Sequence, residues 1–103
     1  MISAPAFIAT KLEAFAGRGQ GDYLFSHDLG DFISVIDGRE SLIDELKASA
    51  AELQAGIAEA VGQLLVTRAF LDSLPGHLPG DAGSQARLPD LIRKLQRIAL
   101  LRA

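Results

Sequence analysis

The chain has 103 residues and a formal net charge of −3, and this length is enough for one domain with a modest hydrophobic core. It has no cysteine and only two histidines, which excludes disulfides and thiolate metal sites and argues against a histidine-based zinc site. Hydrophobic residues make up 49% of the chain, and much of that fraction is alanine and leucine, which favour helices. Val, Ile, Thr, Tyr and Trp are too sparse for a sheet, so we expect an all-α fold.

The charge is unevenly distributed along the chain. Residues 1–86 carry five basic and twelve acidic side chains, whereas residues 87–103 carry five basic and one acidic. An acidic body repels the phosphates of nucleic acid, so we do not expect general nucleic-acid binding. The basic last segment keeps a weaker form of that hypothesis open.

No apolar run approaches the roughly 18 to 20 residues that cross a bilayer. The first residues, MISAPAF, lack the basic and apolar regions of a signal peptide. We therefore expect a cytoplasmic protein that has no membrane association.

Apolar residues recur at helical spacing in successive segments, and this pattern predicts a compact bundle of about five helices. The first helix is expected to begin between Ser3 and Pro5 and to be broken by the glycines of segment 17–21. The second is expected to begin after Ser26, whose hydroxyl can accept from the amides of the first turn, and to end at Gly38.

A short helix is predicted over residues 40–47, with leucine and isoleucine side chains inward. Ser49 followed by Glu52 has the spacing of a capping box, which would open a longer helix that runs through Leu65. These two helices supply the middle of the bundle.

Thr67 is placed to cap one or two further turns, and Pro75 with the glycine after it is expected to stop them. Residues 77–84 have the composition of a loop. The last helix is predicted to run to the chain end from Gln85 or from Pro89, as one kinked helix or as two elements.

The apolar face of the last helix is wider than a core contact requires, because Leu100 and Leu101 extend it. An apolar surface of this kind is typical of partner contacts. One hypothesis for the chain is therefore a non-catalytic helical interaction module, with homo-oligomerisation through the last helix.

The polar residues that stand out lie between Thr10 and Asp31. On a helical wheel Lys11 lies about 60° from the buried position of Ile8, and Arg18 falls on the same flank. Asp28 and Asp31 are three residues apart and therefore neighbours on one face of the second helix. If the two helices are antiparallel, Lys11 and these carboxylates form one cluster.

Two interpretations of this cluster stay open. The first is a helix–helix salt bridge, since Asp28 and Asp31 also lie near a helix N-terminus, where the dipole favours acids. The second is a site in which Lys11 neutralises phosphate charge while an aspartate accepts a proton. The glycine run between the helices matches no phosphate-loop motif, and His27 and His77 have the pattern of surface and loop histidines.

Residues 9–32, ATKLEAFAGRGQGDYLFSHDLGDF, resemble AbiEii-like nucleotidyltransferases, some of which are toxins of type IV toxin–antitoxin pairs. In that family a helix carrying a lysine is followed by an Arg-Gly turn and then by a helix with an Asp-x-x-Asp motif. Weaker similarity continues through DGR at residues 37–39 and LPGHLP at residues 74–79, so the resemblance covers most of the chain.

The resemblance implies roles for particular residues. Lys11 matches the lysine that contacts nucleotide phosphate, and Arg18 and Asp22 match the glycine turn. Asp28 matches an aspartate thought to help in catalysis, with Asp31 as its partner on the helix.

This chain departs from the family in one large respect. Those enzymes begin with an α/β domain in which paired acids on a strand hold the Mg²⁺ that neutralises the triphosphate, and no such motif is present here. The resemblance therefore implies that residues 1–103 form a single helical C-terminal domain, inactive alone and without metal ligands of its own. Mg²⁺ and a nucleoside triphosphate are expected only when an N-terminal nucleotidyltransferase domain or a partner protein completes the site. A natural remnant, one piece of a split protein and an excised fragment are all compatible with this.

Overall fold

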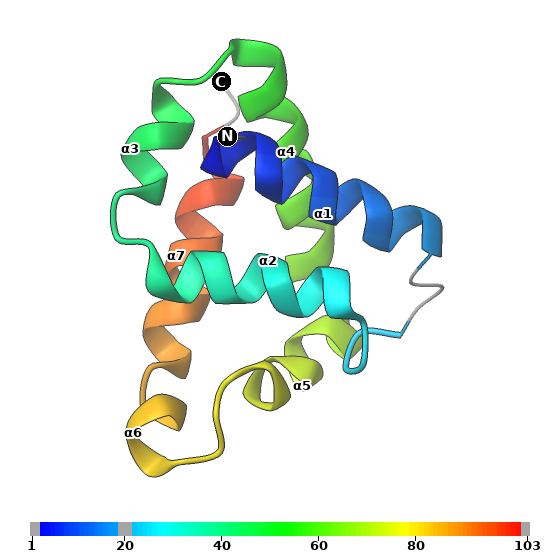
Figure 1. Ribbon diagram of the computed structural model, residues 1–103, viewed down its shortest axis with the longest axis vertical. Helices are drawn as coiled ribbons and strands as arrows, with labels where there is room; N and C mark the ends of the chain where they lie inside the picture. Colours follow the sequence, from blue (N-terminus) through cyan, green and yellow to red (C-terminus); the bar gives the residue numbers. More distant parts are fainter. Residues whose placement is uncertain (1–2, 19–21, 102–103) are drawn as a thin grey trace.

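The computed structural model describes residues 3–18 and 22–101, apart from the side chain of Arg18. This part of the chain forms seven helices and no strand, which confirms the all-α fold (Figure 1). Among the described residues, no helix is both long enough and apolar enough to cross a membrane. The helices are α1 (Ala4–Arg18), α2 (His27–Gly38), α3 (Leu42–Lys47), α4 (Ala51–Leu65), α5 (Arg68–His77), α6 (Ala82–Gln85) and α7 (Leu88–Ala99).

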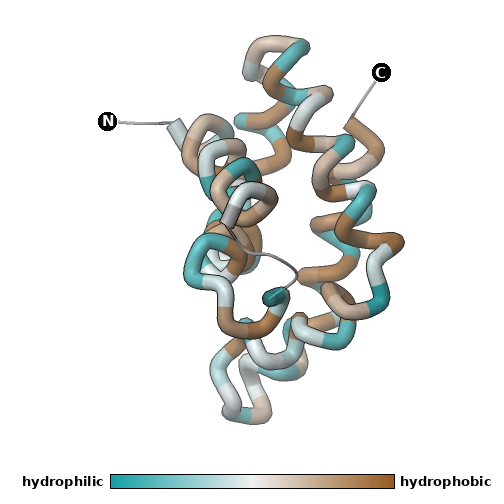
Figure 2. The backbone as a smooth tube through the Cα atoms, turned by 90° about the vertical axis from the view of Figure 1, so that its right-hand side faces the viewer, coloured by the Kyte–Doolittle hydropathy of each residue, from teal (hydrophilic) through white to brown (hydrophobic). Residues whose placement is uncertain are grey.

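The longer helices form two layers that cross each other. Helices α1 and α2 run side by side in opposite directions in one layer, and α4 and α7 pack together in the other (Figures 1 and 2). The apolar face predicted for α2 lies between the layers, and all of its members are at most 1% exposed: Leu29, Phe32, Ile33 and Ile36. Burial of such faces is the main favourable term in a bundle of this kind, because removal of apolar area from water scales with the area buried.

The start of α2 is as predicted. The hydroxyl of Ser26 accepts a hydrogen bond of 3.2 Å from the backbone amide of Leu29, and the helix ends at Gly38. This cap satisfies one of the amides that a helix N-terminus leaves unpaired.

The capping box predicted at Ser49 is wrong. The hydroxyl of Ser49 donates to the carbonyl of Leu46 at 2.6 Å, and α4 begins after Ala50 with no side-chain cap. Thr67 is the N-cap residue of α5, as predicted, but its hydroxyl donates to the carbonyl of Gln63 at 2.8 Å and makes no cap hydrogen bond. In both cases a carbonyl at the end of the preceding helix competes for the hydroxyl.

The prediction that Pro75 stops α5 is also wrong, because the helix continues to His77. Two contacts hold this last turn against the rest of the bundle. His77 Nε2 lies 2.6 Å from the carbonyl oxygen of Tyr23, and Gly76 lies so close to Leu24 that an added Cβ would overlap with Cδ1 of that leucine. Gly76 therefore permits a close approach between α5 and the segment before α2, and tertiary contacts outweigh the local helix-breaking tendency.

The predicted loop after α5 contains one helical turn, α6. Asp81 caps it, since its carboxylate accepts from the backbone amide of Ser84 at 2.9 Å and from the Ser84 hydroxyl at 2.8 Å. Gln85 ties the turn back by donating to the carbonyls of Pro75 and Pro79 at 2.9 and 3.0 Å. Helix α7 then begins separately at Leu88, so the last segment consists of two elements.

The cap of α2 leads to a prediction about stability. Replacement of Ser26 by alanine is expected to lower the free energy of unfolding by about 1 kcal/mol, because the cap bond to Leu29 is lost. Ser34→Ala, the same change at an exposed position within the same helix, is expected to raise it by about 0.5 kcal/mol or less, since alanine favours helix. Urea denaturation of both variants measures the difference, and equal effects would show that Ser26 is not a cap.

Candidate functional site

Helices α1 and α2 bring Lys11 against both aspartates of the second helix. Lys11 Nζ lies 2.9 Å from Asp31 Oδ2 and 3.6 Å from Asp28 Oδ1. The cluster predicted from an antiparallel pairing is therefore present. It joins residues that are separated by the whole turn between the two helices.

The position of the cluster follows from the buried face of α1. Ile8 is fully buried, and the Phe15 ring packs 5.3 Å, centre to centre, from the Tyr23 ring on the segment that enters α2. With that face inward, Lys11 lies on the flank next to α2 and its ammonium lies 5.3 Å from the centre of the Phe7 ring. A cation at this distance from a ring face is attracted to it, which adds a third contact to the lysine.

The cluster keeps Lys11 charged. The hydrogen bond to Asp31 raises the pKa of Lys11 above its ordinary value of 10.5, the negative charges of Asp31 and Asp28 raise it further, and burial opposes them. The exposed fractions of the three side chains differ: 23% for Lys11, 17% for Asp28 and 52% for Asp31. The carboxylate that makes the shorter contact is thus also the one most open to solvent.

Two further residues, Arg18 and Asp22, were matched to the turn between the helices. Arg18 is the last residue of α1, and its side chain lies outside the described part of the structure. Asp22 shapes the turn before α2, because its Oδ1 accepts from the backbone amide of Phe25 at 3.0 Å. This bond gives Asp22 a structural role in the connection between the lysine and aspartate helices.

His77 forms a tertiary contact that was not predicted from the sequence. A carbonyl oxygen can only accept, so the 2.6 Å contact with Tyr23 requires the proton on Nε2 of the imidazole. His77 therefore fastens α5 to the segment that leads into the Asp28 turn. His27, by contrast, is an exposed residue at the first position of α2.

The donor set does not fit a metal ion. Within residues 3–18 and 22–101 no group of three or more His, Cys, Asp or Glu side chains is arranged to hold one. The two aspartates that converge, Asp28 and Asp31, face an ammonium group, and its positive charge opposes a cation at the same place.

Three of the four basic side chains described in the last segment already have partners. Arg87 pairs with Asp37 at 2.9 Å, and Arg93 pairs with Asp90 at 2.8 Å. Lys94 donates to the carbonyl of Asp37 at 3.2 Å, at the C-terminal end of α2, where a cation is favoured. Basic side chains that are paired in this way are less available to bind phosphates, as the nucleic-acid hypothesis requires.

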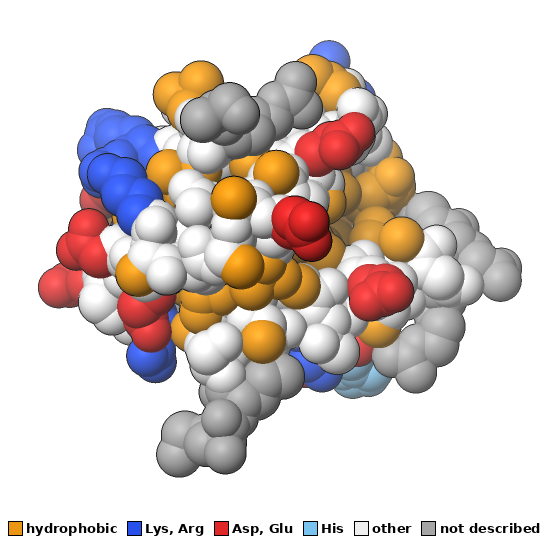
Figure 3. Space-filling model, turned by 90° about the horizontal axis from the view of Figure 1, so that it is seen from above, with side chains coloured by type: hydrophobic (Ala, Val, Ile, Leu, Met, Phe, Trp, Pro, Cys, Tyr) orange, Lys and Arg blue, Asp and Glu red, His pale blue; other side chains and the backbone are white. Residues whose placement is uncertain are grey.

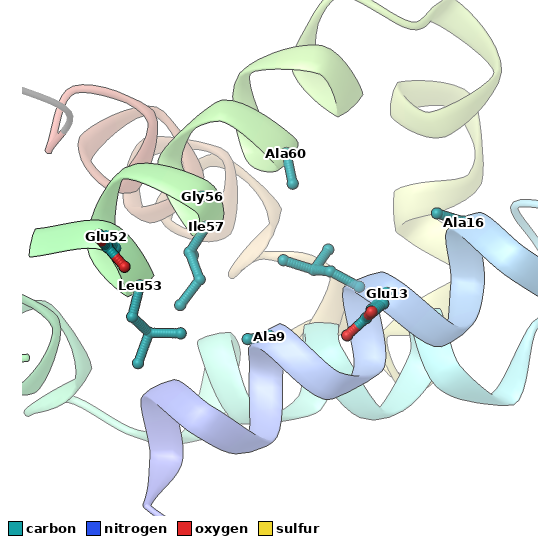
Figure 4. Close-up of a pocket in the computed structure, with 9 residues that line it drawn as sticks. Ala9, Glu13, Ala16, Glu52, Leu53, Gly56, Ile57 and Ala60 are labelled. Carbon is teal, nitrogen blue, oxygen red and sulfur yellow. The ribbon is translucent and has the colours of Figure 1, made fainter. Parts of the chain in front are cut away.

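A second feature, an apolar groove between α1 and α4, was not predicted from the sequence (Figure 4). Its volume is about 290 Å³, and we call it the α1–α4 groove. The groove lies on the flank of α1 away from Lys11. It is lined by Ala9, Leu12, Glu13, Ala16, Glu52, Leu53, Gly56, Ile57 and Ala60.

Comparisons of this chain with protein-family models, with curated proteins and with solved structures find no match. The resemblance to AbiEii-like nucleotidyltransferases thus rests on residues 9–32 and the shorter similarities that follow them.

The Lys11 cluster leads to a pH prediction. A raised pKa in the folded state means that the cluster stabilises the fold below pH 10.5 and that this contribution is lost as the pH rises through the folded-state value. Asp31→Asn is expected to lower the pKa of Lys11 more than Asp28→Asn does, because the Asp31 contact is shorter. NMR titration of the lysine side-chain signals measures both shifts, with the exposed Lys47 as reference. Equal shifts in the two variants would contradict the geometry.

Proposed function

We propose that this chain is the helical half of a nucleotidyltransferase-like protein, whose metal-binding half is a separate domain or partner. In this proposal Lys11 contacts a nucleotide phosphate, and Asp28 and Asp31 form the acidic side of the site. The supporting observation is the convergence of these three side chains from two helices, at 2.9 and 3.6 Å. It occurs at the residues on which the family resemblance rests.

The two aspartates have different environments, and this favours different roles. Asp31 is 52% exposed, so its carboxylate can turn into solvent when a phosphate oxygen takes its place on the Lys11 ammonium. Asp28 is 17% exposed and stays near the site. It is then placed to accept the proton of an acceptor hydroxyl, whose oxygen attacks the α-phosphorus while the bond to pyrophosphate breaks.

The proposal also predicts that the isolated chain is inactive. The carboxylates of Asp28 and Asp31 repel a triphosphate unless a cation neutralises its charge. When the chain is mixed with Mg²⁺, labelled nucleoside triphosphates and RNA, labelling is expected to stay at background. Robust labelling would overturn the dependence on a second half.

Binding can be tested separately from transfer. An NMR titration with ATP, GTP, CTP and UTP, each with and without Mg²⁺, is expected to shift the amides around Lys11, Asp28 and Asp31 at millimolar nucleotide (Kd of about 1 mM, or about −4 kcal/mol). Lys11→Met should abolish these shifts, and Lys47→Met, the same change at an exposed lysine on α3, should leave them unchanged. Shifts that persist in Lys11→Met would contradict the role of that lysine.

A second candidate function is a non-catalytic oligomerisation module. Leu100, just after α7, is 81% exposed, and this large apolar side chain at the end of the last helix favours contact with another copy. Sedimentation velocity over a range of concentrations tests it. A monomer at high concentration would count against this candidate, and association that is lost in Leu100→Glu would support it.

A further inference from the structure

The α1–α4 groove has an apolar floor and walls made of small residues. Leu53 and Ile57 point from α4 towards α1, and Ala9 points from α1 towards α4 (Figure 4). Farther along, Ala16 and Ala60 leave the space between the helices unfilled. Leu12 and Ile57 at the floor are only 8% and 2% exposed, and the partly exposed Ala9, Leu53 and Ala60 provide the accessible apolar surface of the groove.

Gly56 is unexplained by the contacts of the chain itself. It lies in the interior of α4, where glycine is among the least favourable residues, and a Cβ added there would have no atom within 4 Å. Neither a turn nor a close neighbour within the described residues requires glycine at this position. The space above Gly56 is therefore available for another molecule to approach the backbone of α4 closely.

Carboxylates stand on both walls of the groove. Glu13 on α1 and Glu52 on α4 are exposed lining residues, and neither forms an ion pair with another described residue. Glu59 lies on the same side of α4 as Glu52, two helical turns further on, and is exposed as well. Figure 3 shows acidic side chains around an apolar surface on the face seen from above. Among the described residues, the carboxylates of this rim therefore have no ion-pair partner.

We propose that the α1–α4 groove binds an amphipathic helix of a partner protein, with apolar side chains on the groove floor and lysine or arginine side chains against Glu13 and Glu52. A helix that lies between two others packs its ridge of side chains into their groove, and recognition by apolar anchors with charged flanks is a common mode of helix binding. This inference does not depend on the proposed nucleotide site, because the groove is on the other flank of α1 from Lys11.

Two alternative occupants fit less well. The volume of about 290 Å³ lies just below the range of about 300 to 1,000 Å³ that is typical of small-molecule sites, and the groove is a surface feature. A second copy of the chain fits less well on the evidence of its described helices. Its basic helix, α7, already buries its apolar residues Leu91, Leu95 and Ile98 within its own bundle.

The test uses synthetic peptides of about 18 residues that form amphipathic helices with leucine at i, i+3, i+4 and i+7. One peptide carries lysine at the flanking positions and the matched peptide carries glutamate. An NMR titration of the whole chain is expected to show that the lysine peptide shifts amides of the groove, including Gly56, with a Kd at least tenfold lower than that of the glutamate peptide. Shifts confined to the Asp28 face, or equal binding of both peptides, would overturn the proposal.

Two variants with matched controls separate the charge from the apolar floor. Glu13→Lys with Glu52→Lys is expected to reverse the preference between the two peptides, whereas Asp44→Lys with Glu40→Lys, at exposed acids outside the groove, leaves it unchanged. Gly56→Leu fills the groove and is expected to weaken the lysine peptide at least tenfold, and Ala55→Leu, at its exposed neighbour, is not. Unchanged binding to Gly56→Leu, with its fold confirmed by circular dichroism, would overturn the proposal. Concentration-dependent self-association that shifts the groove amides without peptide would also overturn it, in favour of a second copy.

Discussion

The burial of one face of α1 against the rest of the bundle is the constraint on which both candidate sites depend. Ile8, Leu12 and Phe15 form this face and are at most 8% exposed. Once the face is inward, the two flanks of the helix are assigned. Lys11 faces α2 on one flank, and Ala9 with Glu13 faces α4 on the other. A rotation of α1 about its axis would dismantle the lysine cluster and the groove together.

Apolar burial, and not the ion pairs, holds this arrangement. A large apolar side chain that is fully buried, such as Phe32 or Ile33, contributes roughly 1.5 to 3 kcal/mol relative to exposure. The Lys11 contacts are partly exposed and therefore screened by solvent. They can exchange partners without loss of the fold. This is the physical condition that a phosphate-contacting lysine has to meet.

The fold was predictable where local pattern and tertiary contact agree. The buried face of α2 and the cap at Ser26 follow from spacing and from the chemistry of a single hydroxyl. The prediction failed at Ser49 and Pro75 for two reasons. A serine hydroxyl has a choice between donating backwards and accepting forwards, and the helix around Pro75 is held by contacts with a segment about 50 residues earlier in the chain. Dependence on tertiary contacts also explains why the groove was not predicted, because its walls come from α1 and α4 and no local sequence pattern relates these two helices.

The lysine cluster could be anticipated because only one turn separates its two helices, and a reversal of direction fixes which flanks meet. The sequence did not predict that the two aspartates differ in their exposed fraction. The exposed fractions of 52% for Asp31 and 17% for Asp28 depend on three-dimensional packing, which the spacing of the two residues does not reveal.

Both proposed sites present carboxylates to an incoming molecule. Asp28 and Asp31 lie beside Lys11, and Glu13 and Glu52 line the groove. Other basic side chains of the described residues are paired elsewhere, as Arg87 is with Asp37 at 2.9 Å. A triphosphate can approach the first site only with a cation that neutralises it, and a helix is attracted to the second if it is basic. Part of the excess of acidic residues in segment 1–86 therefore lies at the two proposed binding sites.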